Sequence, residues 1–209
     1  MIETESAAKA YVAGLCDAAA IDRLEILVRE LALENEHQNL VAKATIPCVW
    51  QRHIADSAQL LEFCPGAHGI WLDLGSGAGF PGLVIAAMRP EAPVVLVESR
   101  KRRVEWLERA AGLMGLENCR VEGRRLEQVE RFDAGIISAR AFAPLDRLLS
   151  LSARFSTSTT HWVLPKGRSA EQEVQGLPGN RQSMFHVEQS RTDPEAGIIV
   201  GRGQWSGPK

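Results

Sequence analysis

The feature that most constrains the fold is a glycine-rich segment, LDLGSGAGFPG, which runs from Leu72 to Gly82. Its turn glycines are Gly75, Gly77 and Gly79. A strand that ends beside such a turn leaves a tight backbone without side chains at the carboxyl edge of a sheet, where a nucleoside can approach closely. Pro81 would open the next helix, whose N-terminus directs free N–H groups and a partial positive charge at the turn. The segment therefore predicts a nucleotide site after the first strand of an α/β sheet.

Short apolar runs along the rest of the chain predict the other strands. In order, the runs are GIWLDLG, VVLVE, CRVE, FDAGIIS, HWVLP, MFHVEQ and GIIVGRG. Helical segments separate several of them, and this alternation predicts parallel strands covered by helices. No helix is expected between the last two runs, which therefore predict an antiparallel hairpin at the sheet edge. The fold class that follows is Rossmann-like α/β with a mostly parallel seven-stranded sheet.

Two acidic residues bear on the identity of the nucleotide. Asp73 stands one residue ahead of the usual dinucleotide glycine run, where its carboxylate can fix the turn and meet the ammonium group of S-adenosylmethionine (SAM). Glu98 ends the second run, at the spacing where an acidic side chain accepts hydrogen bonds from ribose hydroxyls. NAD enzymes share this ribose acid, and residues 77–82 also satisfy G-x-G-x-x-G. The residues favour SAM, and a NAD-binding oxidoreductase stays open as the alternative.

The first 65 residues differ in character from the remainder. Leu24, Leu27 and Leu31 recur at helical spacing, and a second helical stretch is expected from about Pro47 to Phe63. Pro65-Gly66 then breaks the helical pattern. We predict an N-terminal helical extension over residues 1–65 and a SAM-binding methyltransferase domain, one compact unit, over residues 66–209.

Composition excludes several classes of protein. No apolar stretch reaches the roughly 18 residues that span a bilayer, and the segment MIETESAAKA lacks the basic and apolar regions of a signal peptide. We therefore expect a cytoplasmic protein without a membrane partner. The cysteines are Cys16, Cys48, Cys64 and Cys119. They form no CxxC pair, so neither a metal site nor a disulfide framework is predicted.

The net charge of -2 hides an uneven distribution along the chain. Residues 98–168 hold 14 lysines and arginines against 9 acidic residues, a net charge of +5. The basic residues that could attract phosphates are Arg100, Lys101, Arg102, Arg103, Arg120, Arg124, Arg125, Arg140, Lys166 and Arg168. Such a segment is typical of an RNA-binding face, and a solvated helix face is the alternative interpretation.

Missing motifs narrow the chemistry of the methyl acceptor. Methylation of an exocyclic amino group usually needs an Asn/Asp-Pro-Pro-aromatic motif after the fourth strand, where this chain reads SARAF over residues 138–142. A pyrimidine carbon needs a thiolate nucleophile, but Cys48 precedes the glycine turn and lies in a helical region, so we interpret it as structural. A ring nitrogen with a free lone pair attacks without losing a proton. That reaction needs alignment and desolvation but no general base.

Short motifs spread over most of the chain identify a family. They are Asn35, Asn39-Leu40, Arg52-His53, Asp56-Ser57, Asp73 through Gly82, Lys101-Arg102, Ser138, Arg140-Ala141-Phe142 and Lys166-Gly167. In order and spacing, the chain resembles the bacterial small-subunit ribosomal RNA guanine-N7 methyltransferases. The resemblance implies methyl transfer from SAM to N7 of the guanosine at position 527, in the 530 loop of 16S rRNA, within the small ribosomal subunit. We expect a monomer without a metal. A methyltransferase for another RNA or a small molecule, or a non-catalytic SAM-binding regulator, stays open.

The resemblance also implies a set of cofactor residues. Gly75 and Phe80 would line the glycine turn, Leu126 and Glu127 the adenine end, and Arg140 the methionine side near the transferred methyl group. Arg140 follows FDAGIIS and so should reach the carboxyl edge of the sheet. A surface arginine is the alternative.

Three further residues are candidates for positioning the substrate. Lys166 follows HWVLP and is expected at the rim, either holding a phosphate or solvated. His53 and Asp56 lie three apart on one helical face, where they would dock the N-terminal helices or shape the substrate pocket. Purely local structure is the alternative for this pair. The chain departs from the family at Glu34, Gln38 and Val41, where aromatic residues or threonine would be expected.

Overall fold

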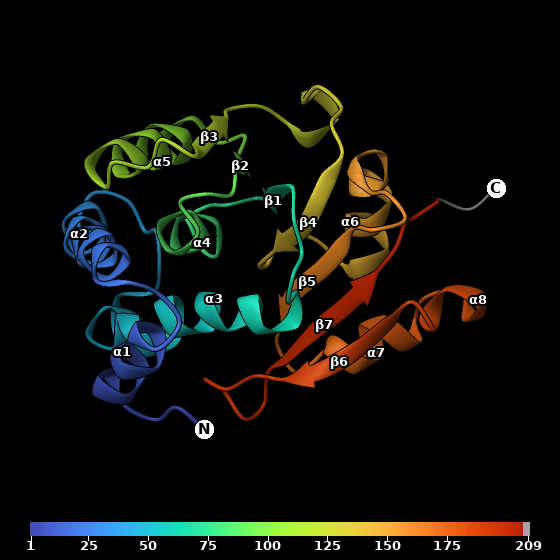
Figure 1. The fold of residues 1–209 in the computed structure, drawn as a ribbon, viewed down its shortest axis with the longest axis horizontal. Coiled ribbons are helices and arrows are strands. Elements are labelled where there is room, and N and C mark those ends of the chain that lie inside the picture. The colour runs from blue at the N-terminus through green and yellow to red at the C-terminus, as the bar shows by residue number, and fades with distance from the viewer. Residues whose placement is uncertain (207–209) are drawn as a thin grey trace.

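The protein is built around one twisted sheet whose strands follow the predicted runs (Figure 1). The computed structural model describes residues 1–206. The strands are β1 (Ile70–Leu74), β2 (Val94–Val97), β3 (Cys119–Glu122), β4 (Ala134–Ala139), β5 (His161–Lys166), β6 (Phe185–Gln189) and β7 (Gly197–Arg202). Their order in the seven-stranded sheet is β3-β2-β1-β4-β5-β7-β6. The first five strands run parallel, and β7 pairs antiparallel with both β5 and β6. The predicted fold class and edge hairpin are confirmed.

The order of the strands creates a natural ligand position. From β1 the chain moves outward through β2 and β3, then returns to add β4 and β5 on the other side of β1. The carboxyl ends of β1 and β4 therefore lie side by side where the winding reverses, which is the place where open α/β sheets bind ligands.

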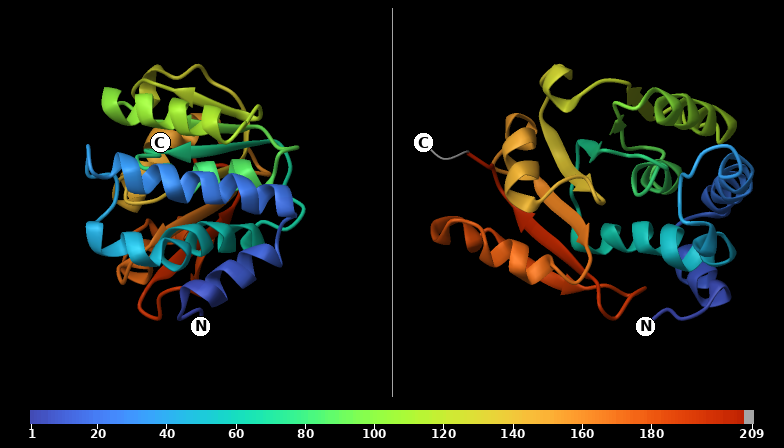
Figure 2. Two further views of the ribbon diagram at one scale, coloured as in Figure 1. Left: turned by 90° about the vertical axis from the view of Figure 1, so that its left-hand side faces the viewer. Right: turned by 180° about the vertical axis from the view of Figure 1, so that it is seen from behind.

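Helices cover both faces of the sheet (Figures 1 and 2). The N-terminal helices α1 (Glu5–Ala13) and α2 (Ala18–Glu34) pack on one face together with α4 (Gly82–Met88) and α5 (Lys101–Leu113). On the other face lie α6 (Leu145–Ser152), the 3-10 turns η4 (Leu126–Gln128) and η5 (Ala153–Phe155), and α7 (Ala170–Gln175), which α8 (Gly179–Gln182) follows. Each face of the sheet therefore has its own hydrophobic core. Because side chains alternate along a strand, Trp71 of β1 packs in the core beneath the N-terminal helices, and Leu72 packs in the core beneath α6 and α7.

The segment between α2 and β1 winds differently from the prediction. The sequence predicts one helix from about Pro47 to Phe63, but helical structure begins at Lys43 and changes form along the way. Its parts are η1 (Lys43–Cys48, 3-10), η2 (Trp50–Ala55, π), α3 (Asp56–Ala58, α) and η3 (Gln59–Phe63, 3-10). Apolar periodicity indicates that a segment is helical but does not resolve these windings, because they differ by less than one residue per turn from the α-helix. Within residues 1–206, no helix combines the length and apolar character needed to span a membrane.

The N-terminal segment closes on the loop between β6 and β7, which lies beside it in Figure 2. The Ile2 N–H donates to the Arg191 carbonyl at 2.7 Å, and the Arg191 N–H donates to Gln59 Oε1 at 2.8 Å. Arg52 pairs with Asp193 at 3.0 Å. These contacts join the N-terminal segment and the helical stretch before β1 to the β6–β7 loop.

Candidate active site

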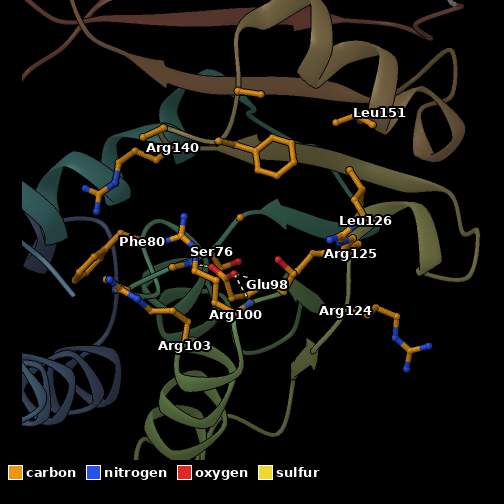
Figure 3. A pocket seen from close by; sticks show the side chains of 18 of the residues that line it. Ser76, Phe80, Glu98, Arg100, Arg103, Arg124, Arg125, Leu126, Arg140 and Leu151 are labelled. Atoms are coloured by element: carbon orange, nitrogen blue, oxygen red, sulfur yellow. Dashed lines mark hydrogen bonds between the residues drawn. The ribbon is translucent and has the colours of Figure 1, made fainter. Parts of the chain in front are cut away.

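An open cavity of about 740 Å³ lies at the carboxyl edges of β1, β2 and β4 (Figure 3). Its walls are the turn after β1, the end of β2 with the start of α5, the residues around η4, the loop after β4, and α6. The predicted site residues in its lining are Gly75, Gly77, Phe80, Glu98, Leu126, Glu127 and Arg140. Those outside it are His53, Asp56, Asp73, Gly79 and Lys166. Phe80 and Arg140 lie toward one end of the cavity and Leu126 toward the other.

The glycine turn forms the floor of the cavity. Gly75 has a φ of +65°, in the left-handed region that side chains disfavour. A Cβ atom at Gly75 would lie 2.5 Å from Cδ2 of Phe142, a residue of the loop after β4. Glycine at this position therefore lets the turn and the β4 loop approach each other closely.

Asp73 lies beneath this floor and is fully buried. Its Oδ2 accepts the Gly82 N–H at 3.3 Å, and its Oδ1 accepts the Ser138 hydroxyl at 2.7 Å. Burial raises the pKa of Asp73 to about 6, although the hydrogen bonds from Ser138, Ser76 and Gly82 oppose the shift. The carboxylate links the end of β1 to the start of α4 and to β4. Its predicted contact with the SAM ammonium stays a prediction.

Glu98 joins the glycine turn to the start of α5. Its Oε2 accepts the Gly77 N–H at 3.2 Å, and its Oε1 accepts the N–H groups of Ser99 and Arg100 at 2.7 and 2.9 Å. A carboxylate has about four acceptor positions, so three backbone bonds leave one position for a ligand. Glu98 lines the cavity, as a residue that binds ribose would have to.

Arg140, Phe80 and His53 form a stack at one end of the cavity. The His53 and Phe80 rings are 5.0 Å apart at an interplanar angle of 19°, and the Arg140 guanidinium lies 5.1 Å from the Phe80 ring centre. Arg140 Nη1 is 3.2 Å from His53 Nδ1 and 3.8 Å from Asp56 Oδ2. The three elements that supply these side chains are far apart in sequence. Arg140 thus lines the cavity and is not a free surface arginine.

These contacts fix the protonation state of His53. An arginine only donates, so His53 Nδ1 must accept from Arg140. The proton then sits on Nε2, which lies 2.8 Å from Oγ1 of Thr45. Burial, with smaller effects from Arg140 and Arg52, lowers the pKa of His53 to about 3. His53 is neutral near pH 7, and its one lone pair is already used.

Asp56 lies near the same Arg140 nitrogen, Nη1, that contacts His53. Its Oδ1 accepts the Thr192 hydroxyl at 2.8 Å and the Gln59 amide at 2.9 Å, so it also bonds to the loop between β6 and β7. Burial raises the pKa of Asp56, and the Arg140 charge acts against that shift. His53 and Asp56 therefore connect the N-terminal helices to the cavity wall.

The buried neutral state of His53 predicts a pH-dependent stability. Below pH 6.5 His53 takes up a proton in the unfolded chain but not in the fold, so stability is lost as the pH falls from 6.5 toward 3. This group contributes up to about 1.4 kcal/mol per pH unit in that window. We expect His53→Gln to flatten the pH dependence of the unfolding free energy, measured by urea denaturation between about pH 4 and 7. As a control, His37→Gln at an exposed position should leave the pH dependence of the unfolding free energy as it is in the wild type. Equal slopes for the wild type and His53→Gln would contradict the conclusion that His53 is buried in its neutral form.

Lys166 occupies a different place from the one predicted. Its Nζ donates to the Ala143 carbonyl and to Glu173 Oε2, both at 2.8 Å, and its side chain is only 9% exposed. Glu173 also accepts the Leu145 N–H at 2.8 Å. The sequence places Lys166 at the end of β5 but does not show that Glu173 lies next to it. Lys166 thus fixes the loop after β4 and does not reach the rim to hold a phosphate.

The basic residues divide into two groups. Those that line the cavity are Arg100, Arg103, Arg124, Arg125, Arg140 and, not predicted from the sequence, Arg147. Lys101, Arg120 and Arg168 lie outside the lining and pair with acidic side chains. Arg102 also lies outside it and donates to the His37 carbonyl at 2.8 Å. Arg147 belongs to the first turn of α6, the helix after the β4 loop. A basic residue at the start of the helix that follows β4 is the sequence feature from which its place at the cavity could have been predicted.

The loop where the chain departs from the family is held by local contacts. Asn35 Oδ1 accepts the N–H groups of Leu40 and Val41, both at 2.9 Å. The Gln38 amide donates to Glu34 Oε1 at 2.6 Å and to the Arg102 carbonyl at 3.1 Å. The loop places Leu40 in the cavity wall, a position that the sequence did not predict.

Known proteins resemble the chain over nearly its whole length. A protein of Erythrobacter litoralis (strain HTCC2594) named ribosomal RNA small subunit methyltransferase G is 64% identical over 204 residues, which cover 98% of this chain and 99% of that protein. The protein of that name from Novosphingobium aromaticivorans is 59% identical over 188 residues, with coverage of 89% and 82%.

Solved structures share the fold at much lower identity. The ribosomal protein L11 methylase of Lactobacillus delbrueckii subsp. bulgaricus superposes with a TM-score of 0.57 at 14% identity and covers 72% of this chain and 78% of its own. A mutant of MtNAS in complex with S-adenosylmethionine superposes with a TM-score of 0.51 at 15% identity, with coverage of 83% and 72%. The model of the GidB family, described as rRNA small subunit methyltransferase G, matches residues 20–193. With this match and the two close relatives, the chain belongs to the rRNA small subunit methyltransferase G family.

Proposed function

We propose that the protein transfers a methyl group from SAM to N7 of the guanosine at position 527, in the 530 loop of 16S rRNA. The observation that carries the proposal is the cavity where the sheet winding reverses, lined by Gly75, Glu98 and Arg140 in a chain of this family. The names of the close relatives support a small-subunit rRNA substrate. The finer choice of N7 rests on the chemistry of the site.

The cavity suits a nucleoside joined to an amino acid. Its volume of about 740 Å³ falls within the roughly 300–1,000 Å³ of small-molecule sites. Leu126 and Glu127 would contact adenine at one end, Glu98 the ribose, and Arg140 the methionine part at the other end. When bound, SAM supplies a methyl group made electrophilic by the sulfonium. The neighbouring Phe80 would help to keep water away from that methyl group.

The side chains around Arg140 suit a reaction without proton abstraction. The N7 lone pair forms the bond to the methyl carbon, the carbon–sulfur bond breaks, and its electron pair stays on sulfur. No proton leaves the guanine. His53 is neutral and bonded on both ring nitrogens, and no cysteine of residues 1–206 lines the cavity. The protein's own residues therefore act by alignment and by excluding water.

The remaining parts of the proposal concern organisation. We propose that residues 1–65 are a helical extension and that residues 66–209 are the SAM-binding domain; residues 207–209 lie outside the described part. We also propose a cytoplasmic monomer that acts on the small ribosomal subunit. The contacts of His53 and Asp56 with Arg140 support the view that the extension helps to build the site.

The position of the methylated base tests the proposed function. Labelled SAM is incubated with the protein and unmodified small subunits, naked 16S rRNA or transfer RNA, and the modified nucleotide is mapped. We expect label at N7 of one guanosine in the 530 loop. Label at another base would refute the substrate assignment. Calorimetry with SAM and with NAD is an independent test, because tight NAD binding without SAM binding would refute the methyltransferase itself.

A further inference from the structure

Three arginines at the cavity have no anionic partner. Arg100 precedes α5, Arg125 precedes η4, and Arg147 belongs to α6, so they come from three separate elements. All three are exposed and line the cavity. Within residues 1–206, none of their side chains makes a hydrogen bond or an ion pair. We refer to Arg100, Arg125 and Arg147 as the arginine rim.

Neighbouring exposed cations behave differently. Lys101 pairs with Glu105, and Arg124 pairs with Glu122 at 3.1 Å. Arg131 is likewise exposed, and no hydrogen bond or ion pair of its side chain is found within residues 1–206, but it lies outside the cavity lining. The rim residues are therefore distinguished by being unpaired and lining the cavity at the same time. Figure 3 shows Arg100 beside Glu98 and Arg125 beside Leu126, so two rim residues stand along the part of the cavity proposed to hold the nucleoside.

The charge of the cavity does not match the proposed methyl donor. Six arginines and two glutamates line it, and the Glu98 carboxylate is already bonded to three backbone N–H groups. SAM carries an ammonium, a sulfonium and one carboxylate, so its own net charge is +1. A cationic cavity repels a cationic ligand. The excess of arginine must then serve a partner with negative charge.

Resting on the proposed function, we infer that the arginine rim binds phosphates of the RNA strand next to the target guanosine and thereby couples RNA binding to SAM binding. Without RNA, the rim charges disfavour SAM. Phosphates that pair with them remove this repulsion, so RNA raises the affinity for SAM. Because linkage is reciprocal, SAM and RNA each favour the binding of the other.

The double variant Arg125→Gln/Arg147→Gln tests the inference. We expect the KM for unmodified small subunits to rise about tenfold, and the slope of log affinity against log salt to fall by about 0.7 for each single-strand phosphate that the rim no longer binds. Without RNA at low salt, SAM should bind about twofold more tightly for each charge removed, the effect expected of a unit charge roughly 10 Å away in water. S-adenosylhomocysteine has no net charge, so its affinity should not change.

A matched control removes an exposed charge far from the rim. Arg29 on α2 is paired with Glu30 and lies outside the cavity, so Arg29→Gln should alter none of these values. The side chains of Arg125 and Arg147 are exposed and unpaired, so the melting temperature of the double variant should equal that of the wild type. Each single variant should produce about half of the effect of the double variant, on a logarithmic scale.

The results expected if the arginine rim does not bind RNA differ from those expected if the protein is not a methyltransferase. An unchanged KM and salt slope in the double variant would overturn the inference while leaving methyl transfer intact. Weaker binding of both SAM and S-adenosylhomocysteine would also overturn it, because the rim would then hold the methionine carboxylate. Failure of the wild-type protein to bind SAM or to methylate small subunits would instead refute the proposed function.

Discussion

Replacing Arg140 with alanine is expected to abolish methyl transfer, with a fall in turnover on the order of 10³-fold. The reason is that Arg140 lines the cavity and contacts both His53 and Asp56. Its removal deletes a charge at the proposed methyl-transfer end and the cation–π contact with the Phe80 ring. Transfer of label from SAM to unmodified small subunits measures turnover, and calorimetry measures SAM affinity.

Two further variants show whether the loss arises at the site. Arg140→Lys keeps the charge but not the planar fork that spans His53 and Phe80, so it should restore only part of the activity. Arg52 is next to His53 in the sequence, but it pairs with Asp193 and does not line the cavity. Arg52→Ala should therefore leave turnover nearly unchanged. Normal turnover and normal SAM affinity in Arg140→Ala, with an unchanged melting temperature, would contradict the role.

The contacts of Arg140 also limit how it can meet the base. An arginine that took both O6 and N7 of guanine would block the nucleophile. In the structure Nη1 contacts His53 and Asp56, so the edge formed by Nη1 and Nη2 is partly used and a contact to the base would come from the remaining N–H groups. Contact with O6, a phosphate or the SAM carboxylate leaves N7 open to attack.

Much of the fold could be predicted because its signals are local. Each of the seven runs forms a strand. The inner strands such as β2 are buried on both faces and therefore need consecutive apolar residues, whereas β3 and β6 at the sheet edges are only partly buried and carry polar residues as well. The hairpin of β6 and β7 follows from the short connection between them, which is too short for a parallel crossover. Pro81 and Gly82 predict a helix after the glycine turn, and that helix begins at Gly82.

The positions of several site residues could not be predicted because they depend on distant partners. His53 and Arg140 are 87 residues apart, and nothing in either local sequence indicates that they meet. The position of Lys166 at the end of β5 predicts that its side chain reaches the edge of the ligand site. In the structure its ammonium is instead bonded to Glu173 and to the Ala143 carbonyl, away from the cavity. Side-chain partners across a fold decide whether a basic residue is free for a ligand, and this information lies in the packing.

Gly75→Ala is expected to lower SAM affinity by on the order of 10²-fold, for two additive reasons. The backbone at Gly75 has a φ of +65°, which costs a residue with a side chain about 1–2 kcal/mol. The new Cβ would also lie 2.5 Å from Cδ2 of Phe142, so the Phe142 ring must move, and it lines the same cavity. Calorimetry with SAM measures the loss, and the melting temperature shows whether the fold is retained.

A double-mutant cycle with Phe142→Ala separates the two causes. If the ring causes most of the loss, Phe142→Ala in the Gly75→Ala background should recover about tenfold in SAM affinity, a coupling energy of roughly 1.4 kcal/mol. Gly77→Ala is the matched control, because Gly77 also has a positive φ of +55°, but its Cβ would meet only the Gly75 carbonyl oxygen at 3.6 Å. Phe142→Ala should therefore bring no recovery in the Gly77→Ala background. Equal recovery in both backgrounds would show that the Phe142 ring is not what Gly75 accommodates, and that the glycines serve only the backbone conformation of the turn.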